Sequence, residues 1–522
     1  MQKINWKRIL SYCCIAILLV FTRIINLGWG LPYPMHPDER NMAVAVQSLA
    51  NSFNPHFFAY GQFPLYLAYF LLQILHLPLT FVNTTLALRF ISAGASIINV
   101  FTLLAIFNLL NHKSKILNHL SIILFIFSPA LIQFAHFGTT ESLLVLFYSL
   151  IIYESLKHDQ NIFFLALWSG LAAATKISAL IFWIVPLMVI TYRFINEPRR
   201  RKVFAQTIKY LGLSTLFGII FSPYNLLSFD EFRNSISYES AVAAGRILVF
   251  YTRQFVGTIP VLFQLTKIFP YALGWPVFIL GILGILGLSW KKKEYNLLRL
   301  AFFIYFVPNA FLFAKWTRFM APIFPLMLIF SVLLLIDISR WLSRRRWRIF
   351  NFQLCLPPGR FSISNAGVVL IILISIIPGI MYLRVYLSPD VRFTATEWIG
   401  EHVPKNSIIL SETANVVDVP FDTQNYRYIS FDFYDLDQNY ELQQELVRDI
   451  KAADYIIVPS RRVFMNHQAN KYPKLNDYYR QLFSGRLGFK KVAEFSINKS
   501  DEQAEETFSV FDHPVIRIYK KI

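Results

Sequence analysis

Residues 315–337, KWTRFMAPIFPLMLIFSVLLLID, are the stretch that decides the fold. After Arg318 this stretch carries no charged side chain until Asp337. A helix needs about 20 such residues to cross roughly 30 Å of hydrocarbon, because each residue rises 1.5 Å along the axis. The stretch therefore predicts a membrane-spanning helix with Lys315 and Arg318 at its start.

Similar apolar runs recur throughout residues 1–387. Hydrophobic residues make up 55% of the chain and charged residues 16%, and the mean hydropathy is +0.45. Soluble domains carry about 25% charged residues, so this composition excludes a single soluble globule and a disordered chain. The runs predict a multi-span α-helical membrane domain with about 11 spans. They lie at 9–29, 86–110, 117–136, 142–156, 161–175, 177–195, 205–226, 268–290, 297–314, 319–337 and 364–386.

The basic residues predict the orientation. The formal net charge is +19. The basic residues of 1–387 lie in short clusters between apolar runs, a pattern typical of cytoplasmic loops and not of a nucleic-acid-binding protein. The first run is long and lacks a small-residue cleavage site, so we expect an uncleaved anchor and not a signal peptide. The basic clusters place the N-terminus in the cytoplasm. The odd number of spans then places the tail on the outer side of the cytoplasmic (inner) membrane. The clusters are Lys113 and Lys115, Lys157, Arg199–Lys202, Lys291–Lys293 and Arg344–Arg348.

Three segments are expected to lie outside the membrane on the outer side. The first is the loop 31–83, whose apolar stretch 63–79 is short and broken by prolines, as in an interfacial or re-entrant helix. The second is the loop 228–267, where we expect a surface helix. The third is the tail 388–522, in which acids slightly outnumber bases.

The tail has the pattern of a soluble α/β domain. Short apolar runs at 407–410 and 455–458 predict buried strands, and helical patterns lie at 394–402 and 441–450. The stretches FKKVAEFSI and FSVFDHPVIRIYKK near the end predict further strands. For YRYISFDFYDLDQNY (426–440), an edge strand and acidic loop are favoured over a sugar-stacking surface.

Carboxylates are scarce in the membrane part, so their positions are informative. Asp38 and Glu39 follow the first span, and Glu141 stands where the fourth span opens on the same outer side. A charged side chain near the membrane is costly unless it is solvated, paired with an opposite charge or required for function. Each has an ordinary alternative: solvated loop carboxylates for the first two, and a favourable helix start for Glu141.

Four cations share this outer face and break the positive-inside pattern: Arg89, Lys176, Lys315 and Arg318. One such side chain is explained by snorkelling at a helix end. Four of them together with three carboxylates suit an enzyme that handles a lipid phosphate, where cations hold the phosphate and a carboxylate takes a proton.

The remaining outer polar residues give a weaker pattern. His36, His56 and Tyr60 are candidate substrate contacts, but the histidines are better explained as hydrogen-bonded loop residues than as metal ligands. Three cysteines, two of them adjacent, form no disulfide or metal motif. No cofactor is expected to be required, although a divalent metal stays open.

In their order, five motifs resemble the GT-C superfamily of polyprenyl-phosphate-sugar glycosyltransferases, and within it the protein O-mannosyltransferase and lipid A aminoarabinose transferase group. The motifs cover roughly residues 1–330, and the tail resembles the outer domains of bacterial members. They are HPDERNMAVAVQSLA (36–50), LALRFISA (86–93), HFGTTESLL (136–144), GLAAATKISAL (170–180) and KWTRFMAPIFPLM (315–327).

The resemblance implies an inverting transfer of mannose or another monosaccharide from a polyprenyl phosphate to a protein, glycolipid or cell-envelope glycan at the outer face. Asp38 would be the general base when the acceptor is a hydroxyl, and Glu39 would support it or position the neighbouring loop. The four cations would hold the donor phosphate. Aminoarabinose transferases often have Asp where Glu141 stands, which leaves the role of Glu141 as a substrate contact open.

Other functions stay possible at this point. A transporter or flippase of a lipid-linked sugar would share the many spans, but it would place polar groups at mid-membrane and on both faces. A polymerase or ligase of surface polysaccharide would use a diphosphate-linked oligosaccharide. A membrane-anchored binding module would not need so many spans. The tail itself could bind an acceptor, cap the active site or contact a partner.

Overall fold

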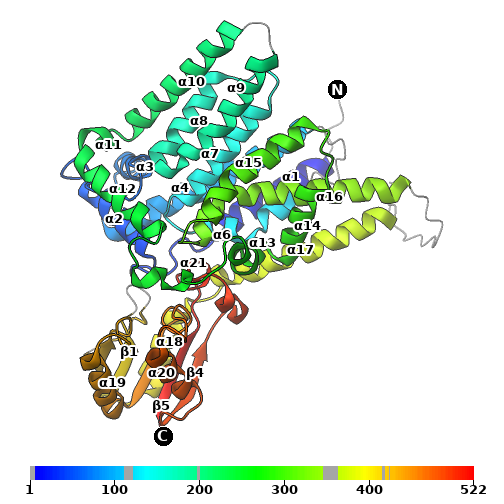
Figure 1. The fold of residues 1–522 in the computed structure, drawn as a ribbon. Helices are drawn as coiled ribbons and strands as arrows, with labels where there is room; N and C mark the ends of the chain where they lie inside the picture. The colour runs from blue at the N-terminus through cyan, green and yellow to red at the C-terminus, as the bar shows by residue number, and fades with distance from the viewer. Residues whose placement is uncertain (1–5, 111–121, 197–199, 345–362, 414–417, 423) are drawn as a thin grey trace.

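The structure is a computed structural model that describes residues 6–110, 122–196, 200–344, 363–413, 418–422 and 424–522. A large helical part comprises everything before residue 388, and a small domain with a sheet projects from one end of it (Figure 1). Several residues singled out in the sequence lie outside the described part, namely Lys3, Lys113, Lys115, Arg199, the cluster residues 345–348 and Cys355.

Every apolar run of the sequence that the structure describes is helical, and surface helices connect the runs. The longer helices are α1 (Trp6–Ile24), α4 (Phe81–Leu109), α7 (Glu141–Leu156), α8 (Ile162–Thr175), α9 (Ile184–Asn196), α10 (Arg200–Phe221), α12 (Phe229–Ala243), α14 (Trp275–Gly287), α15 (Lys293–Ala310), α16 (Phe324–Arg344) and α17 (Ile363–Leu387). The shorter ones are α2 (Pro37–Ser48), α3 (Phe63–Ile74), α6 (Pro129–Ala135), η1 (Ile177–Trp183), α11 (Tyr224–Leu227), η2 (Phe250–Phe255), η3 (Gln264–Ile268), α13 (Phe269–Leu273) and η4 (Thr317–Ile323).

Four helices among the described residues are long and apolar enough to cross a membrane: Phe81–Leu109, Val203–Phe221, Thr317–Trp341 and Val369–Leu387. A bent pair of helices makes a fifth if it counts as one span. The other predicted spans correspond to shorter or interrupted helices, so the number of about 11 stays a prediction. Residues 315–337, the stretch that decides the fold, form η4 and most of α16. In its most apolar segment of 18 residues, 89% is buried, which places this helix at the centre of the helical part.

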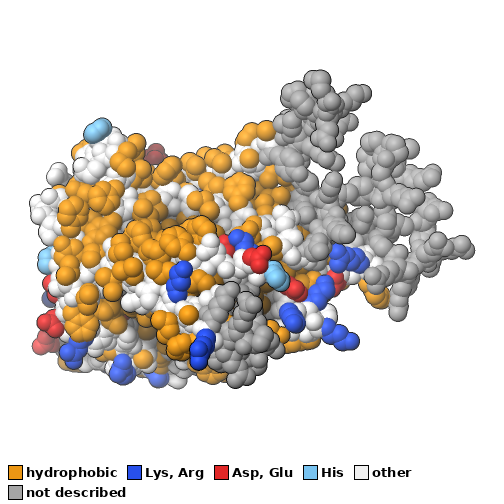
Figure 2. All heavy atoms as spheres, turned by 90° about the horizontal axis from the view of Figure 1, so that it is seen from above, with side chains coloured by type: hydrophobic (Ala, Val, Ile, Leu, Met, Phe, Trp, Pro, Cys, Tyr) orange, Lys and Arg blue, Asp and Glu red, His pale blue; other side chains and the backbone are white. Residues whose placement is uncertain are grey.

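The outer surface of the helices has the character of a lipid-facing surface. Viewed from above, hydrophobic side chains cover most of the described surface and charged ones are few (Figure 2). On α4, Phe90, Ile98 and Phe101 are each more than half exposed. Exposed apolar area on this scale is stable in lipid and not in water.

One predicted span, 268–290, is not continuous. The helices on either side of Gly274 are bent by 115°. Gly274 has φ +78°, and a Cβ there would meet Pro378 Cγ at 2.7 Å, so both its backbone conformation and its close packing require glycine. The chain therefore turns sharply at this point instead of crossing straight.

The tail contains a five-stranded sheet of order β2-β1-β3-β5-β4. The strands β1, β2 and β3 are parallel, and β5 pairs antiparallel with β3 and β4. Helices cover both faces of the sheet. The elements are α18 (Val391–His402), β1 (Ile408–Glu412), β2 (Arg427–Phe431), α19 (Tyr440–Ala452), β3 (Tyr455–Val458), α20 (Pro473–Phe483), β4 (Phe489–Phe495), η5 (Lys499–Gln503), α21 (Glu506–Ser509) and β5 (Ile516–Lys521).

Alternation along the strands builds the two faces. Ile409 and Ile457 pack with α18 on one face, whereas Leu410 and Ile456 pack with the α19 and α20 side on the other. Successive strand residues point to opposite faces, so a strand covered on both sides is apolar throughout, as β3 is. The predicted strands 407–410 and 455–458 and the edge strand within 426–440 are confirmed.

One prediction for the tail is wrong, and one helix of the tail was not predicted. FSVFDHPVIRIYKK was expected to be a strand along its length, but only Ile516–Lys521 pairs, while Glu506–Ser509 is a helical turn and residues 510–515 form a loop. The helix α20 was not predicted. The apolar residues of 508–513 are buried against the helical part of the molecule and not in the sheet, so their pattern was misleading.

Candidate functional site

The first turn of α2 presents two neighbouring acids. His36 is the N-cap in an extended conformation, its ring accepts from the Glu39 N–H at 3.4 Å, and Pro37 is the first helical residue. Proline at this position has the right φ and lacks an N–H that would go unpaired. Asp38 and Glu39 then fall in the first turn, where the helix dipole favours negative charge.

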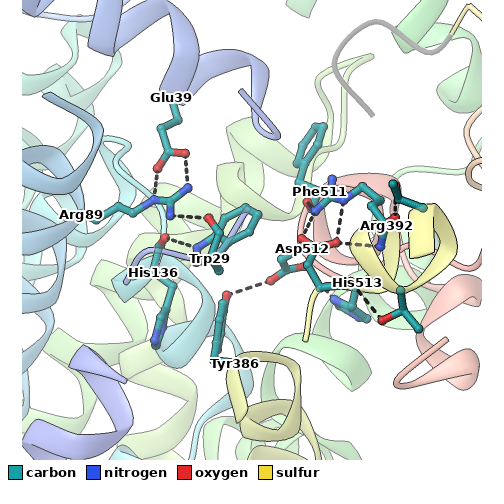
Figure 3. Close-up of polar contacts among 12 residues, drawn as sticks. Trp29, Glu39, Arg89, His136, Tyr386, Arg392, Phe511, Asp512 and His513 are labelled. Carbon is teal, nitrogen blue, oxygen red and sulfur yellow. Dashed lines mark hydrogen bonds and ion pairs between the residues drawn. The ribbon is translucent and has the colours of Figure 1, made fainter. Parts of the chain in front are cut away.

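Glu39 points into the protein and forms a buried ion pair (Figure 3). Its carboxylate receives two hydrogen bonds from Arg89 of α4, at 2.7 and 2.6 Å, and one from the Gly138 N–H at 2.7 Å. Arg89 also donates to the carbonyls of Leu27 and Trp29 at 2.6 and 2.7 Å. Arg89 is fully buried among these contacts, and its role as a phosphate ligand stays a prediction.

Gly138 makes this arrangement possible. A Cβ at this position would lie 2.7 Å from Leu88 Cβ and 3.0 Å from Glu39 Oε1. The missing side chain lets the loop after α6 approach α2 and α4 closely enough to share the Glu39 carboxylate. The motifs 36–50, 86–93 and 136–144 therefore meet at one point.

Asp38 points the other way and pairs with Arg318 of η4. About a fifth of each side chain is exposed, 23% for Asp38 and 19% for Arg318, so the pair is only partly buried. Arg318 also donates to the Tyr60 hydroxyl at 3.3 Å, and its guanidinium lies 4.9 Å from the centre of the Trp316 ring. The predicted base and one predicted phosphate ligand are thus in contact.

Tyr60 connects this pair to a second cation. Lys176 stands between α8 and η1, with its ammonium 4.9 Å from the centre of the Tyr60 ring and 5.4 Å from that of Phe319. Burial raises the pKa of Tyr60, and the carboxylates of Glu141 and Glu239 raise it further. Burial lowers the pKa of Lys176, and the same two carboxylates partly oppose that shift.

These contacts define the polar cluster, by which we mean Asp38, Tyr60, Glu141, Lys176, Glu239 and Arg318. Glu141 is buried at the start of α7 and Glu239 belongs to α12. Sequence reasoning identified every member except Glu239, which is one of several acids in a solvated loop and has no distinguishing local pattern.

Three predicted contacts stand apart from the polar cluster. His36 is buried, its ring centre is 4.3 Å from that of Phe511 and 4.7 Å from that of Phe137, and burial lowers its pKa. It caps α2, and its role as a substrate contact stays a prediction. His56 is exposed and pairs with Glu231 at 2.9 Å. Lys315 is buried and donates to the Phe313 carbonyl at 3.0 Å. Over the described ranges, no group of three or more His, Cys, Asp or Glu side chains could hold a metal ion.

Comparison with known proteins gives a likeness in structure and none in sequence. No protein-family model matches the chain, and no curated protein matches it. The apo crystal structure of the oligosaccharyltransferase of Archaeoglobus fulgidus is 12% identical, with a TM-score of 0.53 over 87% of this chain and 70% of that one. The same archaeal enzyme, AglB, in complex with an inhibitory peptide and a dolichol-phosphate, is 11% identical, with a TM-score of 0.53 over 92% and 73%.

A weaker likeness extends over the full length of another chain. ArnT from Cupriavidus metallidurans, bound to undecaprenyl phosphate, is 11% identical and aligns over 98% of both chains, with a TM-score of 0.48. At that score the likeness adds nothing to the assignment of the fold. The fold that the motif resemblance implied is thus confirmed: the chain shares the fold of the archaeal oligosaccharyltransferase.

Proposed function

We propose that this protein is an integral-membrane inverting glycosyltransferase that moves a sugar from a polyprenyl-phosphate donor to an acceptor at the outer face of the membrane. The fold supports the class of enzyme, and the polar cluster supports the chemistry. The archaeal enzyme of the same fold has been solved with a dolichol-phosphate, which supports a lipid phosphate as the donor's carrier. Mannose or another monosaccharide is the sugar, and a protein, glycolipid or cell-envelope glycan is the acceptor.

The observation that carries the proposal is a pair of unused hydrogen-bond donors at the start of η4. Thr317 Oγ1 and Arg318 Nε are both buried and have no hydrogen-bond partner among the described residues. Leaving a buried donor unpaired costs about 1–3 kcal/mol, more for a charged group, so two of them on consecutive residues need a reason. An oxygen-rich anion such as a phosphate supplies acceptors of the kind that such donors need.

The chemistry follows from the positions of the charges. The acceptor hydroxyl attacks the anomeric carbon and gives its proton to the Asp38 carboxylate. The bond from the anomeric carbon to the phosphate oxygen breaks, and its electron pair leaves with the polyprenyl phosphate. Arg318 and Lys176 offset the charge that develops on the leaving phosphate, and fixed charges at such a position lower the barrier.

Glu141, Tyr60 and Glu239 surround Lys176 and are suited to hydrogen-bond sugar hydroxyls. Arg318 pairs with Asp38 and so orients the proposed base beside the cation that would contact the phosphate.

The proposal is tested by transfer from labelled donors. Membranes that contain the wild-type protein or Asp38→Asn receive a panel of radiolabelled polyprenyl-phosphate sugars and a cell-envelope extract. We expect the wild type to move label from lipid to protein, glycolipid or glycan, and Asp38→Asn to lose at least about 100-fold in rate, the smaller end of what a general base contributes.

Asp230→Asn is the matched control, because Asp230 is an exposed acid of the outer loop that is not in the polar cluster. Equal rates for Asp38→Asn and Asp230→Asn would remove Asp38 as the base. Movement of a lipid-linked sugar across vesicle membranes without a new glycosidic bond would identify a flippase. Transfer from diphosphate-linked oligosaccharides alone would identify a polymerase or ligase.

A further inference from the structure

The connection between β4 and β5 of the tail, residues 496–515, leaves the sheet and packs against the helical part. Ala504, Phe508, Val510 and Phe511 belong to the same buried apolar cluster as Trp29 of the loop before α2 and Tyr386 of α17. This explains why the predicted strand is interrupted there. The connection lies between the two elements that carry Asp38 and Arg318.

Glu505 of this connection is bonded to the start of η4. Its carboxylate accepts from the Thr317 N–H at 2.8 Å and from Gln254 Nε2 at 3.2 Å, and Thr507 holds it from its own segment. Its backbone N–H donates to the Lys267 carbonyl at 3.0 Å. Glu505 is 1% exposed, and Thr317 directly precedes Arg318.

The same connection also supports the start of α2. Phe511 packs on His36, which caps the helix that begins with Asp38, and its carbonyl accepts from Arg392 at 2.8 Å. Asp512 accepts hydroxyl hydrogen bonds from Tyr382 at 2.6 Å and Tyr386 at 2.8 Å, which ties the segment to α17 (Figure 3). One short segment of the tail therefore holds both sides of the Asp38–Arg318 pair.

We infer that the β4–β5 connection is a part of the active site and that Glu505 is a positioning residue, which acts through the Thr317 N–H to hold Arg318 against Asp38 and the donor phosphate. The expected loss of donor turnover rests on the proposed function, whereas the expected loosening of the start of η4 does not. It assigns the tail a task in donor turnover, in place of acceptor binding alone.

The physical reason is that η4 is short and irregular. It begins after a loop and contains Pro322, so its backbone is not held by a long hydrogen-bonded helix on its N-terminal side. A buried carboxylate that accepts a first-turn N–H fixes that end more strongly than a neutral group does. Removing it leaves the Thr317 N–H unpaired in the interior and frees the segment that carries Arg318.

The test uses the full-length protein in membranes or detergent, with Glu505→Ala, Glu505→Gln and the control Glu502→Ala. Glu502 is a buried acid of the same connection, but its two hydrogen bonds go to Arg517 within the tail. We expect Glu505→Ala to lower kcat/KM for the donor at least ten-fold, Glu505→Gln to lose less because it keeps an acceptor oxygen, and Glu502→Ala to stay within two-fold of the wild type.

A double-mutant cycle with Arg318→Lys separates positioning from general structure. If Glu505 acts through Arg318, Glu505→Ala costs clearly less in the Arg318→Lys background than in the wild type. Additive losses, or equal activity of Glu505→Ala and Glu502→Ala, would overturn the inference.

Amide hydrogen exchange gives a readout that does not depend on the function. We expect exchange of residues 315–319 to become faster in Glu505→Ala and not in Glu502→Ala. Unchanged exchange in Glu505→Ala would overturn the inference even if no donor were turned over. If the wild-type protein turned over no donor but Glu505→Ala still exchanged faster than the wild type at residues 315–319, the proposed function would fail and the structural inference would stand.

Discussion

At the scale of single residues, two adjacent carboxylates perform different tasks. Neighbouring residues on a helix point in directions about 100° apart, so Glu39 and Asp38 face different surroundings. Glu39 is fixed inside by Arg89 and the Gly138 N–H, whereas Asp38 is partly exposed beside Arg318. The motif resemblance implied different roles for the two acids. The local sequence did not predict their partners, because these depend on where α4 and η4 lie.

The first prediction concerns Glu39→Gln. Breaking a buried ion pair by removing one charge typically costs 3–5 kcal/mol, so we expect the free energy of unfolding to fall by about 3 kcal/mol or more. Asp38→Asn should cost less, since its pair is partly exposed. Thermal unfolding in detergent compares the two. If Arg89 instead held the donor phosphate, Arg89→Lys would raise the donor KM and leave the stability unchanged.

The second prediction concerns Arg318→Lys. Arg318 contacts both Asp38 and Tyr60 through Nη1, and its planar guanidinium lies beside the Trp316 ring, whereas the ammonium of a lysine is a compact point charge without that plane. We expect kcat/KM for the donor to fall at least ten-fold, although the charge is kept. Initial rates at varied donor concentration measure this. Arg233→Lys, an exposed position on α12, is the control and should change little; equal effects at both positions would contradict a specific contact.

At the scale of elements, apolar periodicity located the helices well and their interruptions poorly. The run 268–290 contains Pro270, Gly274 and Pro276, which permit a bend without requiring one. The sharp turn follows from packing against Pro378 on α17, a contact between segments far apart in sequence. The failure at FSVFDHP has the same origin, because those apolar residues pack on the helical part and not on the sheet.

The third prediction tests this turn through Gly274→Ala. The new Cβ would meet Pro378 at 2.7 Å on a backbone with φ +78°, so strain and overpacking add, each of order 1–3 kcal/mol. We expect a lower unfolding temperature for Gly274→Ala. Gly287→Ala is the matched control in α14, since a Cβ there meets nothing within 4 Å. Equal unfolding temperatures of the two variants would show that the close approach to Pro378 is not maintained.

At the scale of the whole molecule, the tail and the helical part are joined by charged groups that no local pattern reveals. His513 is buried, lies 2.6 Å from Asp512 through Nδ1 and 3.3 Å from Asp501 through Nε2, and stacks edge-on against Tyr382 of α17. Asp512 in turn accepts from Tyr382 and Tyr386. The sequence predicted a strand through Asp512 and His513 and gave no sign of these contacts, because the two tyrosines that bond Asp512 are more than 100 residues away.

The fourth prediction follows from the charge of His513. Burial alone would lower the pKa of His513, but Asp512 and Asp501 outweigh it and raise the pKa to about 10. The unfolded value is about 6.5, so the stabilisation is complete below pH 6.5 and is lost as the pH rises towards 10, because the unfolded chain releases this proton first. The unfolding temperature of the wild type should therefore fall across this range. In His513→Asn, which keeps a donor near Nδ1 but cannot be charged, the fall should be shallower. Parallel curves for the two proteins would mean that His513 is neutral in the folded state and that its charge does not stabilise the tail.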